Sequence, residues 1–199
     1  MSQIVEKMRQ EIISRSCRFE EQTKGTKDEY NIYREHIQYV YKYAVMLSED
    51  KNVDGEVVEL AALLHDISMT DMTLDRSRHN ELGADIAERL LRKNHYPEDK
   101  THLVKKCILN HSKKRREYRN TTEEQILVDA DGLSHFEAVN QIYSLARAVM
   151  GLSEEDSVRF VQDKLTADYD ELSDDLKYLV KDKYGKVMAA KCAEDVLQC

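Results

Sequence analysis

The sequence predicts an all-α fold, and three features of its composition and pattern lead to that prediction. The chain has one Pro and 6 Gly among 199 residues, so it contains few of the residues that interrupt helices or form tight turns. Apolar residues recur at intervals of three and four positions, which is the spacing of one helix face. No segment sustains the alternation of apolar and polar residues that is typical of a strand. We therefore expect one compact domain over residues 1–199, with roughly nine or ten helices.

Stripes of apolar residues predict the helices of the first third of the chain. These stripes are Ile4, Met8 and Ile12 in the first helix, and Tyr33, Ile37, Val40, Ala44 and Leu47 in the second. The polar segment 24–28 separates the two helices, and Asp54 with Gly55 is expected to start a third. Residues 57–64 of that third helix are apolar nearly all round, which is typical of a helix buried at the centre of a bundle.

The remaining helices are predicted from similar stripes and from capping signals. Residues 67–78 have no clear period and are expected to form a loop, and Pro97 marks the first position of a later helix. The segment 122–125 matches a capping box and should start a helix that carries Asp129 and Asp131, with a kink near Gly132. The stripes are Leu82, Ile86 and Leu90, then Val104, Cys107, Ile108 and His111, then Phe136, Val139, Tyr143, Ala146 and Met150, and, after a cap at Ser153, others as far as Met188.

The composition restricts both the class of protein and its partners. Hydrophobic residues make up 41% and charged residues 34%, which is typical of a folded globular protein, and the net charge of -8 disfavours a nucleic-acid polymer or an anionic membrane as the main partner. No apolar stretch is long enough to span a bilayer, and the N-terminus lacks the apolar segment of a secretory signal. The four cysteines form no close pair, which favours reduced thiols, so we expect a cytoplasmic location. The oligomeric state stays open.

Six residues point to a metal centre, because their types are those that hold catalytic divalent ions. They are His36, His65, Asp66, His79, His111 and Asp131, and each lies within or beside a helical segment. Asp66 follows His65 at the end of an apolar helix, a place where a carboxylate is rarely found unless it is paired or bound to an ion. Side chains from facing helices converge inside a bundle, and the two oxygens of Asp66 could bridge two metals. A metal ion there would convert water into a nucleophile near neutral pH, able to attack an electrophilic phosphorus.

The order of these residues resembles the HD superfamily of metal-dependent phosphohydrolases. Its defining set is a His, a His-Asp pair and a distant Asp, which correspond to His36 in HIQYVYKYA, the pair in AALLHDIS and Asp131 in LVDADGLSHF. The resemblance covers roughly residues 30–150, and the helices of 153–198 are expected to pack on this core. It implies an enzyme that hydrolyses a small phosphoester, with a nucleotide among the candidates, and it assigns Asp66 a catalytic role as metal ligand.

The resemblance also implies a second metal site. Superfamily members with two metals have two further histidines, and the contexts RHNELGADIAERLL and ILNHS place them at His79 and His111. One or two divalent ions are therefore expected, with Fe and Mn favoured and Zn, Ni, Co or Mg as alternatives. The family pattern selects Asp131 over Asp129 as the last ligand. His135, one turn after Asp131, is interpreted as a partly exposed helix residue, with a supporting role beside the metal ligands as the alternative.

One position departs from the pattern of the phosphohydrolases. Many of them have Lys, Arg or Glu three residues after the Asp of the pair, where this chain has Met69. Arg76, Arg78 and Lys113 are the basic residues that we expect to bind the substrate phosphate instead, since Arg suits bidentate phosphate contact. A solvated basic helix end is the alternative interpretation of the KKRR run after His111. Two other functions stay open, a di-iron oxygenase of the HD type and a metal-binding regulatory domain.

Overall fold

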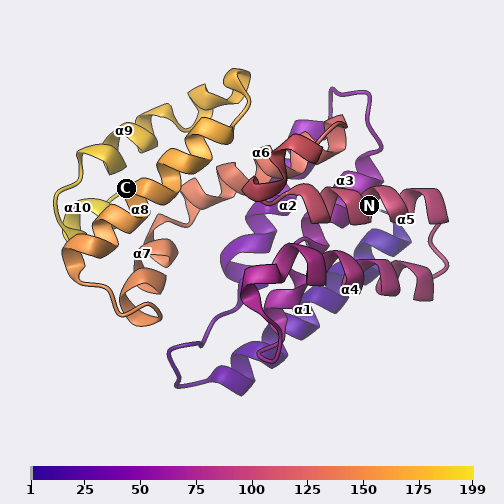
Figure 1. Cartoon of the computed structure of the whole chain (residues 1–199), viewed down its shortest axis with the longest axis horizontal. Helices are drawn as coiled ribbons and strands as arrows, with labels where there is room; N and C mark the ends of the chain where they lie inside the picture. The colour runs from indigo at the N-terminus through magenta and orange to yellow at the C-terminus, as the bar shows by residue number, and fades with distance from the viewer. Residues whose placement is uncertain (1) are drawn as a thin grey trace.

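The computed structural model describes residues 2–199, and within that range it contains helices and no strand, as Figure 1 shows. The α-helices are α1 (Gln3–Thr23), α2 (Gln38–Ser48), α3 (Gly55–Leu64), α4 (His79–Lys93), α5 (Glu98–Asn110), α6 (Thr122–Glu137), α7 (Val139–Ala148), α8 (Glu154–Glu171), α9 (Lys181–Ala189) and α10 (Ala193–Leu197). A π-helical turn, η1 (Tyr33–Ile37), leads into α2, and four short 3-10 segments are η2 (Ile67–Thr70), η3 (Arg76–Arg78), η4 (Lys113–Tyr118) and η5 (Asp174–Leu179). The all-α prediction is confirmed.

Helix α3 lies at the centre of the first group of helices, α1 to α6. The Asp54 side chain caps it by accepting from the Val57 amide at 3.3 Å, and seven of its ten residues are buried. It contacts α1, α2, α5 and α6, so its nearly continuous apolar surface is covered from several sides. A helix without a polar face gains hydrophobic stabilisation only in such a position, which is why its sequence predicted central burial.

The C-terminal helices α7 to α10 form a second group beside the first, and the long helix α6 reaches from one group to the other (Figure 1). Helix α8 contacts α6, α7 and α9. The Gln162 side chain donates to the carbonyls of Val187 and Ala190, each at 3.0 Å, and so holds the end of α9 against α8. The second group therefore packs on the first through α6 and α8.

Three local predictions differ from the structure. The capping box that starts α6 uses Thr121 and Glu124, one position before the predicted pair, because the run TTEEQ satisfies the motif in two frames. Residues 67–78, predicted as loop, contain η2 and η3. Helix α6 continues through Gly132, and the interruption falls at Ala138 instead. A Cβ at Gly132 would lie 3.3 Å from Leu172 Cδ2, so this glycine permits close packing on the end of α8.

Two further features of the fold bear on the site. A Cβ at Gly83 would lie 2.7 Å from the His65 carbonyl oxygen, so α4 packs directly on the peptide at the end of α3 because Gly83 has no side chain. Close contact of α4 brings its first residue, His79, toward the His65–Asp66 pair. Among the described residues, no helix is long and apolar enough to cross a membrane.

Candidate metal centre

Helix ends supply most of the candidate ligands. The six residues are His36 in η1, His65 at the end of α3, Asp66 directly after it, His79 at the start of α4, His111 at the end of α5, and Asp131 within α6. Three of the histidines make the same local hydrogen bond: Nδ1 of His65, His79 and His111 lies 2.9, 3.1 and 2.6 Å from the carbonyl oxygens of Ala62, Arg76 and Ile108. For His65 and His111 these carbonyls lie in the last turn of a helix, where they have no partner within the helix.

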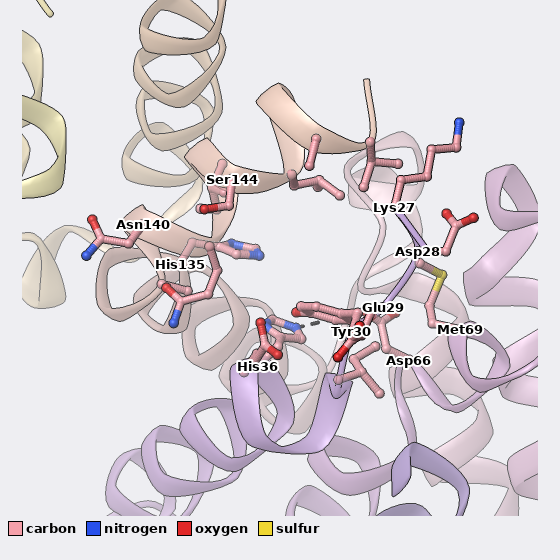
Figure 2. A pocket seen from close by; sticks show the side chains of 18 of the residues that line it. Lys27, Asp28, Glu29, Tyr30, His36, Asp66, Met69, His135, Asn140 and Ser144 are labelled. Carbon is pink, nitrogen blue, oxygen red and sulfur yellow. Dashed lines mark ion pairs between the residues drawn. The ribbon is translucent and has the colours of Figure 1, made fainter. Parts of the chain in front are cut away.

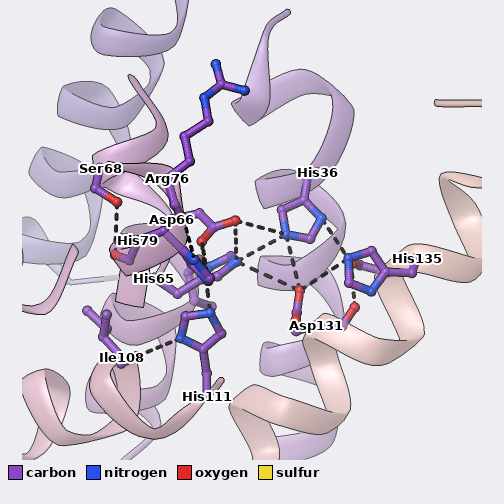
Figure 3. Close-up of polar contacts among 12 residues, drawn as sticks. His36, His65, Asp66, Ser68, Arg76, His79, Ile108, His111, Asp131 and His135 are labelled. Atoms are coloured by element: carbon purple, nitrogen blue, oxygen red, sulfur yellow. Dashed lines mark hydrogen bonds and ion pairs between the residues drawn. The ribbon is translucent and has the colours of Figure 1, made fainter. Parts of the chain in front are cut away.

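These hydrogen bonds fix the tautomer of each ring. A carbonyl oxygen only accepts, so Nδ1 of His65, His79 and His111 carries the hydrogen. His36 Nδ1 lies 3.2 Å from Ser134 Oγ, and that hydroxyl donates to the Asp131 carbonyl at 2.7 Å, so Oγ accepts from His36. In the neutral form, which is the form of imidazole that binds a metal, all four rings therefore direct the Nε2 lone pair toward one interior region (Figure 3).

Asp66 lies between two pairs of histidines. Its Oδ1 lies 3.9 Å from Nε2 of both His79 and His111, whereas its Oδ2 lies 3.6 Å from Nε2 of His65 and 3.9 Å from Nε2 of His36 (Figure 3). Oδ1 is buried and has no hydrogen-bond partner within the described part of the chain. An unpartnered buried carboxylate oxygen is costly unless a cation compensates it. Each oxygen of Asp66 thus faces a different pair of Nε2 atoms.

The spacing of the ligand atoms fits a metal ion. His36 and His65 bring their Nε2 atoms to 3.1 Å, and Asp131 Oδ1 lies 3.2 Å from the former and 3.9 Å from the latter. Two imidazole lone pairs at that distance repel each other unless a cation lies between them. Ligand atoms that lie about 2.1 Å from an ion and at right angles to each other are about 3.0 Å apart. His36, His65 and Asp131 form one group of potential ligand atoms, and Asp66, His79 and His111 form another.

The charge states favour metal binding. Burial lowers the pKa of His65 to about 4, which keeps this ring neutral. Burial also lowers the pKa of His36, but the Asp131 carboxylate outweighs it, so the pKa is raised above its usual value. For Asp66 and Asp131 burial opposes ionisation, yet the surrounding histidines hold both carboxyl pKa values below the usual range. The two ionised carboxylates and the neutral His65 are in the protonation states that bind a cation, whereas a metal ion at His36 competes with a proton.

Asp129, the alternative to Asp131, faces another part of the molecule. It accepts from the Ser173 amide at 2.9 Å and from the Ser173 hydroxyl at 2.7 Å, and so ties α6 to the segment after α8. Burial raises its pKa. The structure therefore brings Asp131, and not Asp129, to the histidines.

A second cluster, which we call the Asp168 cluster, adjoins the first and consists of Lys113, His135, Lys164 and Asp168. Asp168 is 4% exposed; its carboxylate lies 2.7 Å from Lys164 Nζ, 3.1 Å from His135 Nδ1 and 3.0 Å from Lys113 Nζ. The His135 ring stacks on His36 with the ring centroids 5.2 Å apart. The sequence-based interpretation missed this cluster, because only the spacing of His135, one turn after Asp131, links it to the site before α8 is placed.

Because of the Asp168 cluster, we expect the stability of the fold to decrease as the pH falls in the acid range. Burial opposes ionisation of Asp168, but His135 and Lys164 hold its pKa well below the usual range. Its stabilising contribution is therefore complete above the pKa of about 3.9 in the unfolded chain, and it is lost as the pH falls from there toward the folded pKa. We expect Asp168→Asn to lower the free energy of unfolding by about 3 kcal/mol at pH 7, and by clearly less at pH 2.5, in urea titrations. An equal loss at both pH values would contradict this assignment.

A cavity of about 520 Å³ opens beside the ligand atoms (Figure 2). Its wall includes His36, Asp66 and Met69 on the side of the histidines, and His135 and Lys164 on the side of the C-terminal helices. It therefore joins the two groups of helices and reaches both clusters.

The three predicted substrate-binding residues differ in position. Arg76 lines the cavity, whereas Arg78 lies outside it, with its guanidinium 2.7 Å from the Glu81 carboxylate. Lys113 contacts Asp168 and does not line the cavity either. These three residues were chosen because they are close in sequence to the histidines, and that closeness does not determine which side chains line the cavity.

Comparison with known proteins gave one match. A family model for the HD domain matches residues 33–135, a range that includes all six candidate ligands and ends at His135. Neither curated proteins nor solved structures gave a significant match. Helices α7 to α10 lie outside the matched range.

Proposed function

The chain belongs to the HD domain family, a superfamily of metal-dependent phosphohydrolases, and we propose that it hydrolyses a small phosphoester with one or two bound divalent metal ions. The observation that carries this proposal is the position of Asp66, whose two oxygens each face the Nε2 atoms of a pair of histidines. One of these oxygens, Oδ1, is buried and has no hydrogen-bond partner among the described residues. A buried arrangement of that kind is unfavourable without cations and favourable with them.

We assign His36, His65 and Asp131 to one metal and His79 with His111 to the second, with Asp66 as a ligand of both. The Nδ1 hydrogen bonds hold each ring in the orientation in which Nε2 faces the ion, and partners of this kind raise the affinity of metal sites. Bound there, a divalent ion supplies a water nucleophile near neutral pH and neutralises charge on the phosphoryl oxygens. Fe and Mn are the ions that we favour.

The protein itself would bind and orient the substrate through the cavity wall. Arg76 and Lys164 both line the cavity, and their positive charges suit the oxygens of a phosphate that the metals do not contact. The Lys164 ammonium is held by the Asp168 carboxylate at 2.7 Å, so little side-chain entropy is lost when it contacts an anion. Lys164 would thereby perform the role that a polar side chain has in many relatives at the position of Met69.

The adjacent arginines provide a matched pair of variants for this substrate role. We expect Arg76→Ala to raise KM for phosphoesters about tenfold with little change in metal content, since it removes one charged contact with phosphate. Arg78→Ala should leave KM within about twofold, because Arg78 is paired with Glu81 outside the cavity. Steady-state kinetics with elemental analysis of each variant measures both effects. Equal changes in KM for the two variants, or loss of metal in Arg76→Ala, would contradict the assignment.

A di-iron oxygenase is the second candidate, and Met69 is the observation that favours it. This apolar side chain lines the cavity at a position where many phosphohydrolases of the superfamily have a polar residue. Relatives that use oxygen bind two irons with the same set of ligands. Oxygen uptake by the iron-loaded protein, without phosphate release from any ester, would establish this function in place of hydrolysis.

The proposed function is tested by loading the protein with Mn²⁺ or Fe²⁺ and offering a panel of phosphoesters, nucleotides included, with and without oxygen. We expect phosphate release that depends on the metal and proceeds equally well under anaerobic conditions. A chain that binds metal but neither releases phosphate from any ester nor takes up oxygen would instead be the metal-binding regulatory domain that we considered as a third function.

A further inference from the structure

Helix α7 carries two apolar stripes, and each faces a different environment. Val139, Tyr143 and Ala146 are all buried and belong to the packed interior of the C-terminal helices. The other stripe consists of Ala138, Ile142, Leu145 and Val149, and all four line the cavity beside the metal centre. Spacings of four, three and four positions place these residues on one face. We call this set the cavity stripe.

The cavity stripe is not fully covered by protein. Leu145 is 42% exposed, whereas Ala138 and Ile142 are buried, and Phe160 of α8 and the buried Ile32 before η1 also line the cavity. A single exposed leucine on a convex surface needs no explanation. An apolar stripe inside a cavity that also reaches catalytic side chains is the usual composition of a ligand site.

Charged residues also line the cavity, among them Lys27, Asp28, Glu29 and Glu35 of the segment 27–35. Among the acidic residues of the segment 28–35, Glu29 accepts from the Gly25 amide at 2.7 Å and Glu35 from the Asn31 amide at 3.3 Å, so both stabilise their own segment. Asn140 and Ser144 lie on α7, where Figure 2 shows them across the cavity from segment 27–30. Both are exposed, which leaves them at the rim. The cavity wall therefore includes the candidate ligands His36 and Asp66 and, along α7, the apolar residues of the cavity stripe.

We propose that the substrate is a phosphate monoester of an apolar alcohol, an inference that rests on the proposed phosphohydrolase function. The phosphate lies at the Asp66 end, and the apolar group lies along the cavity stripe. Water attacks phosphorus, a new P–O bond forms and the bond to the alcohol oxygen breaks. One hydrogen of the water stays on the released hydrogen phosphate, and the other is transferred to the alcohol.

The position of the stripe explains why the family alone does not identify this substrate. Residues 33–135 of the family match supply the metal centre, whereas Ile142, Leu145 and Val149 come after it. The family match therefore does not describe the residues that we expect to contact the apolar group of the substrate.

The test measures binding of n-alkylphosphonates, which resist hydrolysis, to the Mn²⁺-loaded protein by calorimetry. From ethyl to hexyl, we expect Kd to fall about threefold for each added methylene. This factor is slightly smaller than the change in Kd that complete burial of one methylene group would produce. The corresponding alkyl phosphates should show kcat/KM rising by a similar factor in phosphate-release assays. Equal Kd values for the ethyl and hexyl compounds would overturn the proposal.

Two leucines of equal exposure provide the variant and its control. Leu145→Asn should reduce the dependence of Kd on chain length to less than twofold per methylene, whereas Leu179→Asn should leave it unchanged, because Leu179 is also 42% exposed but lies in η5 outside the cavity. A nucleoside monophosphate that binds more tightly than hexylphosphonate, with no effect of Leu145→Asn, would overturn the proposal in favour of a nucleotide substrate.

Different results would overturn the hydrolytic function and the apolar subsite. Binding that strengthens with chain length, without phosphate release from any ester, would support the apolar subsite and overturn the hydrolytic function. Phosphate release at equal rates from ethyl and hexyl phosphate would support hydrolysis and overturn the subsite.

Discussion

Asp66→Asn should lose most bound metal and reduce phosphate release by at least about a thousandfold while the helices stay intact. The reason is that Asp66 is the one candidate ligand in contact with both pairs of histidines, so its replacement removes a charge from two metal positions at once. An amide has a similar shape but no charge, and its NH2 group would face Nε2 atoms or a cation. Elemental analysis after gel filtration, phosphate release and far-UV circular dichroism measure the three parts of this prediction.

Asp71→Asn is the matched control for that experiment. Asp71 lies five positions further along the same segment, is exposed, and bonds only locally, with its carboxylate accepting from the Thr73 amide and hydroxyl. Metal content and turnover should therefore match those of the unmodified protein. Should Asp66→Asn keep both its metal and its full activity, the ligand assignment is wrong.

Asp131→Ala and Asp129→Ala should have opposite effects, although the two residues are separated by a single alanine in α6. Loss of Asp131 removes the carboxylate beside His36 and His65, so we expect about one metal fewer per chain and a fall in activity of at least about a hundredfold. Loss of Asp129 removes two hydrogen bonds to Ser173, so we expect about 2 kcal/mol less stability and unchanged metal content.

Metal analysis and urea unfolding of the two variants, side by side, distinguish these effects. The reverse result, with metal lost in Asp129→Ala and kept in Asp131→Ala, would show that the family pattern had been applied to the wrong aspartate.

The helices and the candidate metal ligands could be predicted from the sequence. The residues that contact those ligands in the folded protein could not. Helical periodicity identified α3 as the central helix because a surface helix cannot be apolar nearly all round. The order of the histidines and aspartates along the chain, together with the resemblance to the HD superfamily, identified the six candidate ligands. The first inference depends only on local chemistry and the second also on the family pattern, and the structure brings these six residues together in two groups.

Features that depend on long-range packing could not be read in the same way. His135 looked like an ordinary helix residue until α8 placed Lys164 and Asp168 against it, and no local pattern connects those positions. Arg76 and Arg78 are two residues apart in one short turn, yet only Arg76 lines the cavity. A kink was expected near Gly132, whereas the structure shows that the absence of a side chain there admits Leu172.

Counting the metal ions bound to the protein tests the central claim most directly. The metal-free chain is equilibrated with an excess of Mn²⁺ or anaerobic Fe²⁺, separated from free ion by gel filtration, and analysed for metal per chain. The two groups of ligand atoms predict about two equivalents in the unmodified protein and about one in His111→Ala. No retained metal in the unmodified protein, or the same number in both proteins, would contradict a metal centre built from these residues.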